Sequence, residues 1–94
     1  MSRVPEGTPF QMAVWAELLR IPRGEVRTYT QIAAAIGRLT ATRAVANACG
    51  ATPDAPRVPC HRVVRSDGGL GGYSGPGGIA TKRRMLREEG VDID

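Results

Sequence analysis

The fold is decided by residues 30–50, which read TQIAAAIGRLTATRAVANACG. Thr30 is a preferred helix N-cap, apolar side chains follow it at helical spacing, and Gly37 provides a left-handed stop. A second helix is predicted from Thr40 to about Cys49. The residues expected on its inward face are Ala44, Val45 and Ala48. Two short helices across a tight turn indicate a helix-turn-helix.

One further helix is predicted on each side of this motif. The run Thr8-Pro9-Phe10-Gln11 places Thr at an N-cap, Pro at the first helical position and Gln at the third. This capping box opens a helix that is expected to end at Pro22 to Gly24. The last helix is expected from about Ile79 to Glu89, with Gly90 as its stop.

A β-hairpin is predicted before the last helix. Cys60 to Arg65 has the β-branched content of a strand, residues 66–69 are a turn signal, and Leu70 to Tyr73 can return as the hairpin partner. The predicted fold class is therefore α/β, mostly α: a winged helix-turn-helix of three to four helices with a small β-hairpin wing. At 94 residues we expect one domain, over residues 1–94.

The amino-acid composition indicates which kind of partner the chain binds and in which cell compartment it works. The 13 Lys and Arg residues outnumber the 9 Asp and Glu residues, which favours a polyanionic partner. No secretory start and no apolar run of roughly 18 residues occur, so we expect a cytoplasmic protein without a membrane partner. A reducing cytoplasm would keep Cys49 and Cys60 as free thiols. One His and two Cys fall short of the four ligands of a structural zinc site, so neither a metal nor a cofactor is expected.

The segment Pro59-Cys60-His61-Arg62-Val63 places a possible nucleophile beside the only histidine and a permanently charged guanidinium. A free cysteine is little ionised near neutral pH, so a nucleophilic one needs a base or a positive field. On an extended backbone the side chains of Cys60 and His61 would point to opposite faces; either the chain turns there or a water bridges them. The alternative is that Cys60 is a small buried apolar residue. For Cys49, a place in the core or on the helix surface is preferred to a catalytic one.

The second helix of the predicted motif is made almost entirely of small residues. Beyond Arg43 and Asn47 it carries little that could read base edges, so sequence-specific recognition in the major groove is not expected. A helix with small side chains and one long side chain that can insert into the DNA suits the narrow minor groove. Proteins there mostly contact the DNA backbone and recognise the shape of the groove. The alternative is that the alanines only favour the helix and tight packing.

With these residues identified, the chain resembles the active-site domain of the alkylguanine-DNA alkyltransferases, also called methylated-DNA protein-cysteine methyltransferases. The resemblance runs from Thr8 to Gly90, and several separate motifs occur in family order. These motifs are Thr8-Pro9-Phe10-Gln11 with Val14-Trp15, Ile21-Pro22-Arg23-Gly24-Glu25, Thr28-Tyr29, Arg43-Ala44-Val45, Pro59-Cys60-His61-Arg62-Val63, Gly72-Tyr73-Ser74-Gly75, and Lys82 through Glu89.

The resemblance implies a protein that binds double-stranded DNA containing alkylated guanine through the minor groove. Arg43 would enter the base stack as the target nucleotide rotates outward, and Tyr29 would crowd the phosphate of that nucleotide. Extruding a nucleotide costs a few kcal/mol, least for one that pairs badly. The residues expected to contact DNA are Thr28, Tyr29, Arg43, Ala44 and Asn47.

The resemblance also implies the chemistry. Cys60 would attack the alkyl carbon, while His61 takes the thiol proton through a water and Glu89 orients His61. Tyr29 or Lys82 would help to neutralise the departing guanine. Ser74 and the backbone around Val63 and Tyr73 are expected to shape the guanine pocket. The product is a thioether, so the protein would act once.

The chain departs from the family pattern in two places. Thr52-Pro53 stands where the family often has Asn before the proline, whose side chain braces two segments. We expect the chain to lack the family's usual amino-terminal domain, as alkyltransferase-like proteins do, which commonly carry Trp in place of Cys60. The second hypothesis is therefore a monomeric damage sensor that binds the lesion without transfer and recruits excision-repair proteins. A third, based on the helix-turn-helix alone, is a winged-helix transcriptional regulator. For the alkyltransferase, too, we expect a monomer.

Overall fold

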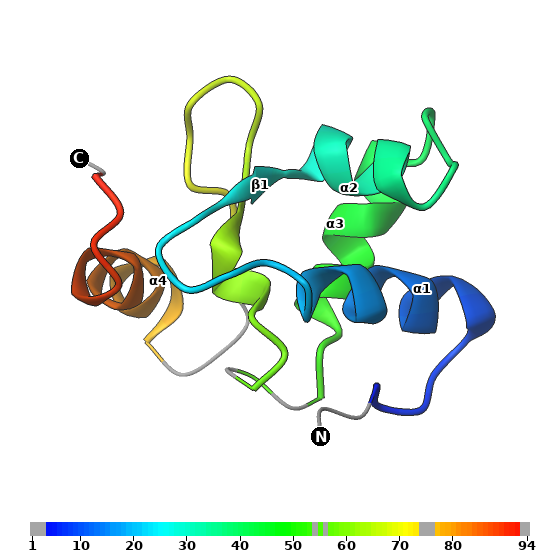
Figure 1. Ribbon diagram of the computed structural model, residues 1–94, viewed down its shortest axis with the longest axis horizontal. Coiled ribbons are helices and arrows are strands. Elements are labelled where there is room, and N and C mark those ends of the chain that lie inside the picture. The colour runs from blue at the N-terminus through cyan, green and yellow to red at the C-terminus, as the bar shows by residue number, and fades with distance from the viewer. Residues whose placement is uncertain (1–3, 54, 56, 74–76, 93–94) are drawn as a thin grey trace.

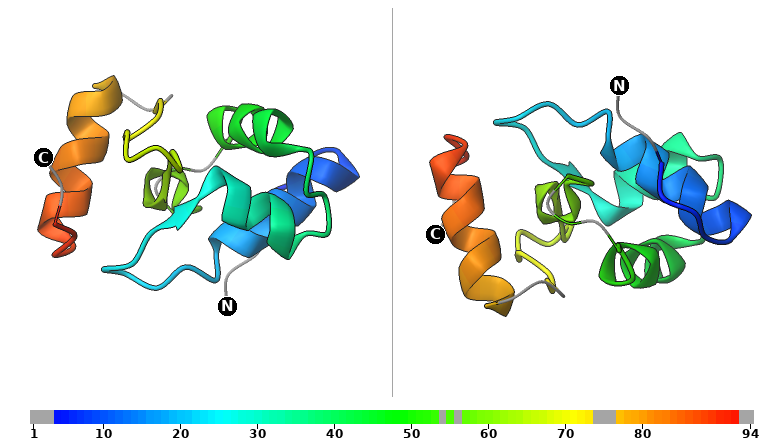
Figure 2. Two further views of the ribbon diagram at one scale, coloured as in Figure 1. Left: turned by 90° about the horizontal axis from the view of Figure 1, so that it is seen from above. Right: turned by 90° about the horizontal axis from the view of Figure 1, so that it is seen from below.

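Helices dominate the computed structural model, which describes residues 4–53, 55, 57–73 and 77–92 (Figure 1). Helices α1 (Pro9–Leu18), α2 (Tyr29–Ala35) and α3 (Thr42–Gly50) pack against one another. Helix α4 (Gly78–Glu88) lies apart from them, across the segment that carries Cys60 (Figure 2). The predicted class, a mostly helical helix-turn-helix fold with a small sheet, is confirmed.

The sheet differs from the predicted hairpin. Strand β1 (Arg27–Thr28) pairs in parallel with β2 (Val63–Val64), and the residues preceding β2, Cys60–Arg62, form a 3₁₀ turn. The expected partner strand at Leu70 to Tyr73 is not formed, so the prediction of an antiparallel hairpin is wrong. The physical reason is Lys82, whose Nζ donates to the carbonyl oxygens of Val63 at 2.6 Å and Gly72 at 3.2 Å. A buried ammonium, instead of a β-ladder, therefore joins the two segments.

Capping boxes open α1 and α2. The predicted box at α1 is confirmed, because the Thr8 hydroxyl accepts from the Gln11 N–H at 3.1 Å and the Gln11 side chain accepts from the Thr8 N–H at 3.0 Å. Helix α2 starts earlier than predicted, since Thr28 and not Thr30 is its N-cap, in a second box of the same kind. Tyr29 is therefore the first residue of α2 and not part of a connector.

The remaining helix boundaries shift by a few residues. Helix α1 ends at Leu18 and α3 begins at Thr42, so both are shorter than predicted. Val45 and Ala48 are buried on α3 as expected, but Ala44 is exposed, which corrects its predicted inward place. In the described ranges, no helix has the length and apolar content that crossing a bilayer requires.

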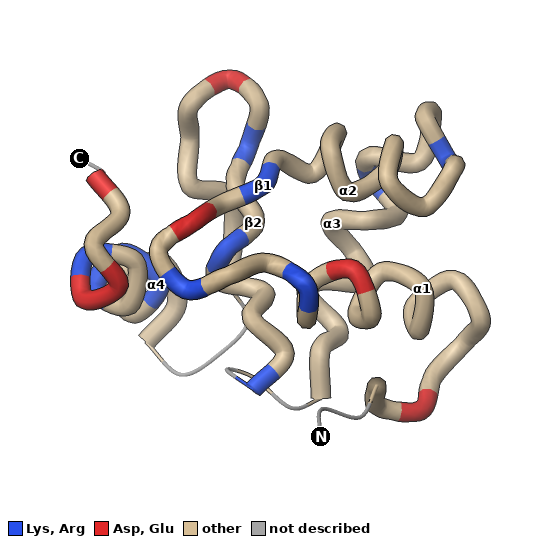
Figure 3. The backbone as a smooth tube through the Cα atoms, in the orientation of Figure 1, with Lys and Arg blue, Asp and Glu red and all other residues tan. Residues whose placement is uncertain are grey.

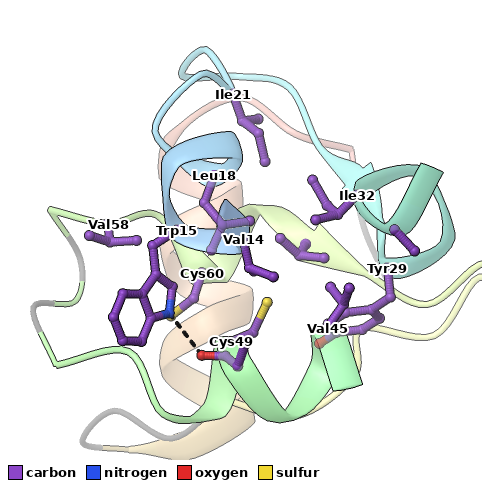
Figure 4. Packing of buried hydrophobic residues seen from close by; sticks show 13 residues of the cluster. Val14, Trp15, Leu18, Ile21, Tyr29, Ile32, Val45, Cys49, Val58 and Cys60 are labelled. Atoms are coloured by element: carbon purple, nitrogen blue, oxygen red, sulfur yellow. Dashed lines mark hydrogen bonds between the residues drawn. The ribbon is translucent and has the colours of Figure 1, made fainter. Parts of the chain in front are cut away.

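The core lies between the three packed helices and the Cys60 segment (Figure 4). Trp15 is 2% exposed, and its indole N–H donates to the Ala48 carbonyl at 2.9 Å. Burying so large a ring, with its one polar group satisfied, ties α1 to the C-terminal half of α3. The buried cluster consists of Val14, Trp15, Leu18, Ile21, Tyr29, Ile32, Ala33, Val45, Ala48, Cys49, Val58, Cys60 and Val63.

Candidate active site

A cavity of about 410 Å³ opens beside Cys60. It lies between α3, the start of α2 and the segment that leads to α4. Its lining residues are Tyr29, Ala46, Asn47, Cys49, Gly50, Cys60, Gly72 and Tyr73. Cys60 is only 4% exposed, yet it lines this cavity and is a free thiol. The sulfur-bearing residue is therefore buried beside an opening and not enclosed in the apolar interior.

The 3₁₀ turn sets the direction of the Cys60 and His61 side chains. Within it the Arg62 N–H donates to the Pro59 carbonyl at 2.9 Å, and the Val63 N–H donates to the Cys60 carbonyl. Because the backbone turns here, the strict alternation of faces along a strand does not apply. The turn, one of the two options left open by the sequence, is therefore present, and the water bridge stays a prediction.

Three charged or polar side chains form a network that does not line this cavity but a separate one, of about 290 Å³. Nε2 of His61 lies 2.9 Å from Oε2 of Glu89, and the Arg62 guanidinium donates to both Glu89 oxygens, each at 2.9 Å. The same guanidinium donates to the Ile21 carbonyl at 2.9 Å, so it is fixed at two points. The hydrogen bonds from Arg62 hold the pKa of Glu89 down at about 2, with a smaller contribution from His61. Glu89 is therefore a carboxylate near neutral pH.

His61 is arranged as a neutral base. Because the Glu89 carboxylate can only accept, Nε2 of His61 carries the proton in their hydrogen bond. Burial lowers the pKa of His61 below its usual value, and Glu89 acts in the opposite direction. Among the described residues, Nδ1 of His61 is a buried polar atom without a hydrogen-bonding partner. Its lone pair is therefore available to accept a proton.

Both thiols of the cavity are mainly protonated near neutral pH. Burial raises the pKa of Cys60, while Thr52 and the Lys82 ammonium act to lower it. Burial also raises the pKa of Cys49, to about 12. Of the two places predicted for Cys49, the core and the helix surface, it occupies the core, but it also lines the cavity, which the sequence did not reveal.

Lys82 lies near Tyr29, which lines the cavity, but Lys82 is not itself a lining residue. Lys82 is fully buried on α4, and its Nζ lies 5.8 Å from the centroid of the Tyr29 ring, within cation–π range. Burial lowers the pKa of Lys82 to about 8 and raises the pKa of Tyr29 to about 12. Lys82 can therefore lose a proton much nearer to neutral pH than Tyr29 can.

The close approach of the backbone at Gly71 fixes the Tyr29 hydroxyl. A Cβ atom at Gly71 would lie 2.7 Å from Oη of Tyr29, and the φ angle of Gly71 is +76°, which disfavours other residues. Only a glycine leaves Tyr29 in its observed place. The sequence predicted a strand for this stretch and did not indicate what the glycine faces.

The residues predicted to contact DNA lie on α3 and at the start of α2, and two of them, Tyr29 and Asn47, line the cavity. Arg43, Ala44 and Asn47 are exposed on α3, and Asn47 also lines the cavity. Arg43 and Asn47 are four residues apart, so they share a face of α3 and are separated by about 6 Å along the axis. The Thr28 hydroxyl is used as the N-cap of α2, next to Tyr29.

The residues predicted to shape the guanine pocket lie in different parts of the structure. Tyr73 lines the cavity, and its hydroxyl lies 3.9 Å from Sδ of Met85. Val63 is fully buried and is held through its carbonyl by Lys82, so its side chain belongs to the core. Ser74 lies outside the described residues. Within the described ranges, no group of three His, Cys, Asp or Glu side chains is placed to hold a metal ion.

Comparison with known proteins places this geometry in context. Residues 9–91 match the family described as 6-O-methylguanine DNA methyltransferase, DNA binding domain. The chain is 51% identical over 84 residues to a methylated-DNA--protein-cysteine methyltransferase of Salmonella typhimurium, covering 89% of this chain and 48% of that protein. In general it spans about half or less of the length of the curated relatives that it matches.

Two solved structures share the fold. The Mycobacterium tuberculosis OGT in complex with DNA superposes with a TM-score of 0.85 at 51% identity, over 89% of this chain and 51% of that one. S. pombe Atl1, in complex with damaged DNA containing O6-carboxymethylguanine, superposes with a TM-score of 0.81 at 31% identity, over 94% of this chain and 82% of that one.

Proposed function

Because the chain belongs to the 6-O-methylguanine DNA methyltransferase family, we propose that it binds double-stranded DNA containing alkylated guanine and transfers the alkyl group irreversibly to Cys60. The observation that carries the proposal is the place of Cys60. Its thiol lines a cavity of about 410 Å³ and is followed directly by a histidine that an ionised carboxylate orients. This arrangement is the general one for an activated cysteine nucleophile.

In the proposed reaction, the thiol proton passes to Nδ1 of His61 through one water molecule. The Cys60 thiolate then attacks the alkyl carbon; the S–C bond forms, the bond from that carbon to the guanine oxygen breaks, and its electron pair stays with the guanine. Glu89 stabilises the imidazolium that results. Cellular reductants do not cleave the thioether product, so one molecule of protein repairs one lesion.

The departing guanine anion needs a proton or a positive charge. Lys82, with a pKa of about 8, is the better proton donor of the two candidates, whereas Tyr29, with a pKa of about 12, stays protonated and can donate a hydrogen bond. Two of the three Lys82 protons are used by the carbonyls of Val63 and Gly72. We therefore assign the proton to Lys82 and the hydrogen bond to Tyr29.

The DNA is proposed to approach along the exposed face of α3. Ala44 lets the backbones come close, Asn47 stands at the cavity wall, and Arg43 lies one helical turn away, where it can fill the gap left by an extruded nucleotide. Basic residues also occur on β1, on the loop after β2 and in the turn between α2 and α3 (Figure 3). Phosphate contacts there would add affinity without sequence specificity.

The proposal is tested with a DNA duplex whose O6-methylguanine is radiolabelled in the methyl group. Label should move to the protein at one methyl per molecule, with the matching gain in intact mass, and peptide mapping should find it on Cys60. Cys49 lines the same cavity and is the internal control, which should stay unlabelled. The Cys60→Ser variant should take up no label. Absence of transfer at stoichiometric protein would overturn the proposal.

A second candidate function is a damage sensor that binds the lesion, leaves the alkyl group in place and recruits excision-repair proteins. The observation that favours it is the compact match to S. pombe Atl1, of which this chain covers 82%. Tight binding to alkylated DNA with no loss of the alkyl group would select this function. Under either function we propose a monomer without metal or cofactor, working in the cytoplasm, where a reducing environment keeps the Cys60 thiol free.

A further inference from the structure

The carboxyl end of α4 needs support from outside the helix, because Glu89 lies where the helix stops. Glu89 is the C-cap of α4, directly after the last helical residue. The last carbonyls of a helix lack partners within the helix, and helix ends fray. The negative end of the helix dipole also disfavours a carboxylate at this position. The side chain that orients His61 is therefore carried by the part of α4 that is least stable by itself.

The loop between α1 and β1 reaches this end of α4 (Figure 2). Nη2 of Arg23 donates to the Glu88 carbonyl at 3.1 Å, so a basic side chain from another segment caps the helix. The next residue, Gly24, has a φ angle of +91°, and a Cβ atom there would lie 3.2 Å from the Glu89 carbonyl oxygen. The backbone that carries the Glu89 side chain is thus contacted by two successive residues of the loop.

The same loop reaches Glu89 by a second, buried route. The Ile21 carbonyl accepts from Arg62 at 2.9 Å, and Arg62 donates to both oxygens of the Glu89 carboxylate. Ile21 is 4% exposed, whereas Arg23 is exposed. The carboxylate is therefore held from inside the protein, and the backbone behind it is held from the surface. Only the surface contact can be removed without opening the core.

Water can reach the region between these contacts. The separate cavity of about 290 Å³ is lined by Arg23, His61, Arg62, Met85, Glu88 and Glu89. Arg23 and Glu88 are exposed, and a cavity of this size with a polar lining can hold water. The side chains of His61 and Glu89 are only 2% and 8% exposed, so their hydrogen bond is sheltered in the observed arrangement. Movement of the end of α4 would let water compete for that bond.

We propose that Arg23 is a positioning residue for the base of the site: by capping α4 at the Glu88 carbonyl, it keeps the Glu89 carboxylate on Nε2 of His61. The inference rests on the proposed function, because His61 acts as a base there. It gives a role to a motif that the reaction itself does not use, Ile21-Pro22-Arg23-Gly24-Glu25.

The test follows two ring N–H groups by NMR and uses no DNA, so its failure is distinct from failure of the alkyl transfer. The chain has one histidine and one tryptophan, so each ring gives a single N–H signal. Arg23→Met keeps a long side chain and removes its donors. Solvent exchange of the His61 Nε2–H should become about fivefold faster, as expected for the loss of one ordinary hydrogen bond. The Trp15 N–H, which donates to the Ala48 carbonyl, should exchange as in the native protein.

Two further variants isolate the hydrogen bond. Arg20→Met, the matched control, removes the same charge three residues earlier, where the side chain is 80% exposed and lies 3.9 Å from Glu17. Its His61 exchange rate should stay within about twofold of the native rate. Arg23→Lys keeps a positively charged donor and should restore most of the protection.

An unchanged His61 exchange rate in Arg23→Met would overturn the proposal, as would an equal increase in Arg20→Met. A parallel increase at Trp15 would also overturn it, because the fold as a whole would then be opening. Exchange in Arg23→Lys as fast as in Arg23→Met would do the same, since the donor is the stated cause.

The effect on the reaction is measured separately with lesion-containing duplex. Arg23→Met should transfer the methyl group about fivefold more slowly than Arg20→Met, while the two variants bind lesion-free DNA equally well. Equal transfer rates would overturn the role of Arg23 in the reaction. A native protein that transfers no methyl group would refute the proposed function and leave the exchange result standing.

Discussion

Neutralising Glu89 should destabilise the protein in a pH-dependent way. Glu89 accepts from His61 and twice from Arg62, and its side chain is 8% exposed. Folding lowers the pKa of Glu89 from 4.5 to about 2. At about 1.36 kcal/mol per pKa unit, this shift corresponds to a contribution of about 3 kcal/mol to the free energy of unfolding. Discounted for partial solvent screening, we expect Glu89→Gln to lower the free energy of unfolding by about 2 kcal/mol at pH 7.

The sign of the pH dependence follows from the direction of the shift. A carboxyl group whose pKa is lowered on folding contributes its full stability above the unfolded pKa and loses it as pH falls through the folded one. Urea unfolding of the native protein and of Glu89→Gln should therefore differ most near pH 7. The two curves should converge between about pH 4.5 and pH 2.

A matched control lies one residue earlier on α4. Glu88 pairs with Arg84 at 3.2 Å, but both side chains are about 60% exposed. Glu88→Gln should change the free energy of unfolding by no more than about 0.5 kcal/mol. The reasoning is refuted by equal effects of the two substitutions, or by an effect of Glu89→Gln that is as large at pH 3 as at pH 7.

Three further outcomes are expected. Arg43→Ala should slow methyl transfer from duplex DNA at least tenfold. The urea midpoint of unfolding should change little, because the Arg43 side chain is exposed. An unchanged transfer rate would count against insertion of Arg43 into the base stack. Binding to a lesion-free duplex, measured by fluorescence anisotropy, should weaken steeply between about 50 and 200 mM salt, and a flat response would contradict a phosphate-based interface. Gly71→Ala should lower the free energy of unfolding in urea by about 1–3 kcal/mol, because its Cβ would lie 2.7 Å from Oη of Tyr29. Gly72→Ala, whose Cβ meets nothing within 4 Å, should lower it by less.

Local signals in the sequence predicted the helices well. The capping box at Thr8 is a four-residue pattern, and the sequence predicted it correctly because no distant residue is needed to form it. The start of α2 was misplaced for a local reason too: Thr28 and Thr30 are both good caps, and only Thr28 has Gln three positions later. The capping-box pattern therefore distinguishes Thr28 from Thr30 as the N-cap of α2.

The features that could not be predicted from the sequence depend on contacts between residues far apart in the chain. The β1–β2 pairing joins two segments of two residues each, too short for any periodicity, and the chain that follows β2 is held by Lys82 from α4. In the site, the pairing of His61 with Glu89 was inferred from family resemblance alone. Arg62, which fixes Glu89, was read only as a charge beside the cysteine, since nothing local indicates a partner 27 residues away.

Burial acts on the two partners of the proposed proton transfer in opposite directions. It raises the pKa of Cys60 and lowers the pKa of His61, so the free protein holds a neutral thiol beside a neutral imidazole. The ionised pair must form against burial, and fixed charges nearby make that possible: Glu89 on the imidazolium side and Lys82 on the thiolate side. Because Arg62 makes the largest contribution to the low pKa of Glu89, the carboxylate stays charged whether or not His61 is. The charge that stabilises the imidazolium is therefore in place before the proton moves, which is the condition for electrostatic stabilisation without reorganisation.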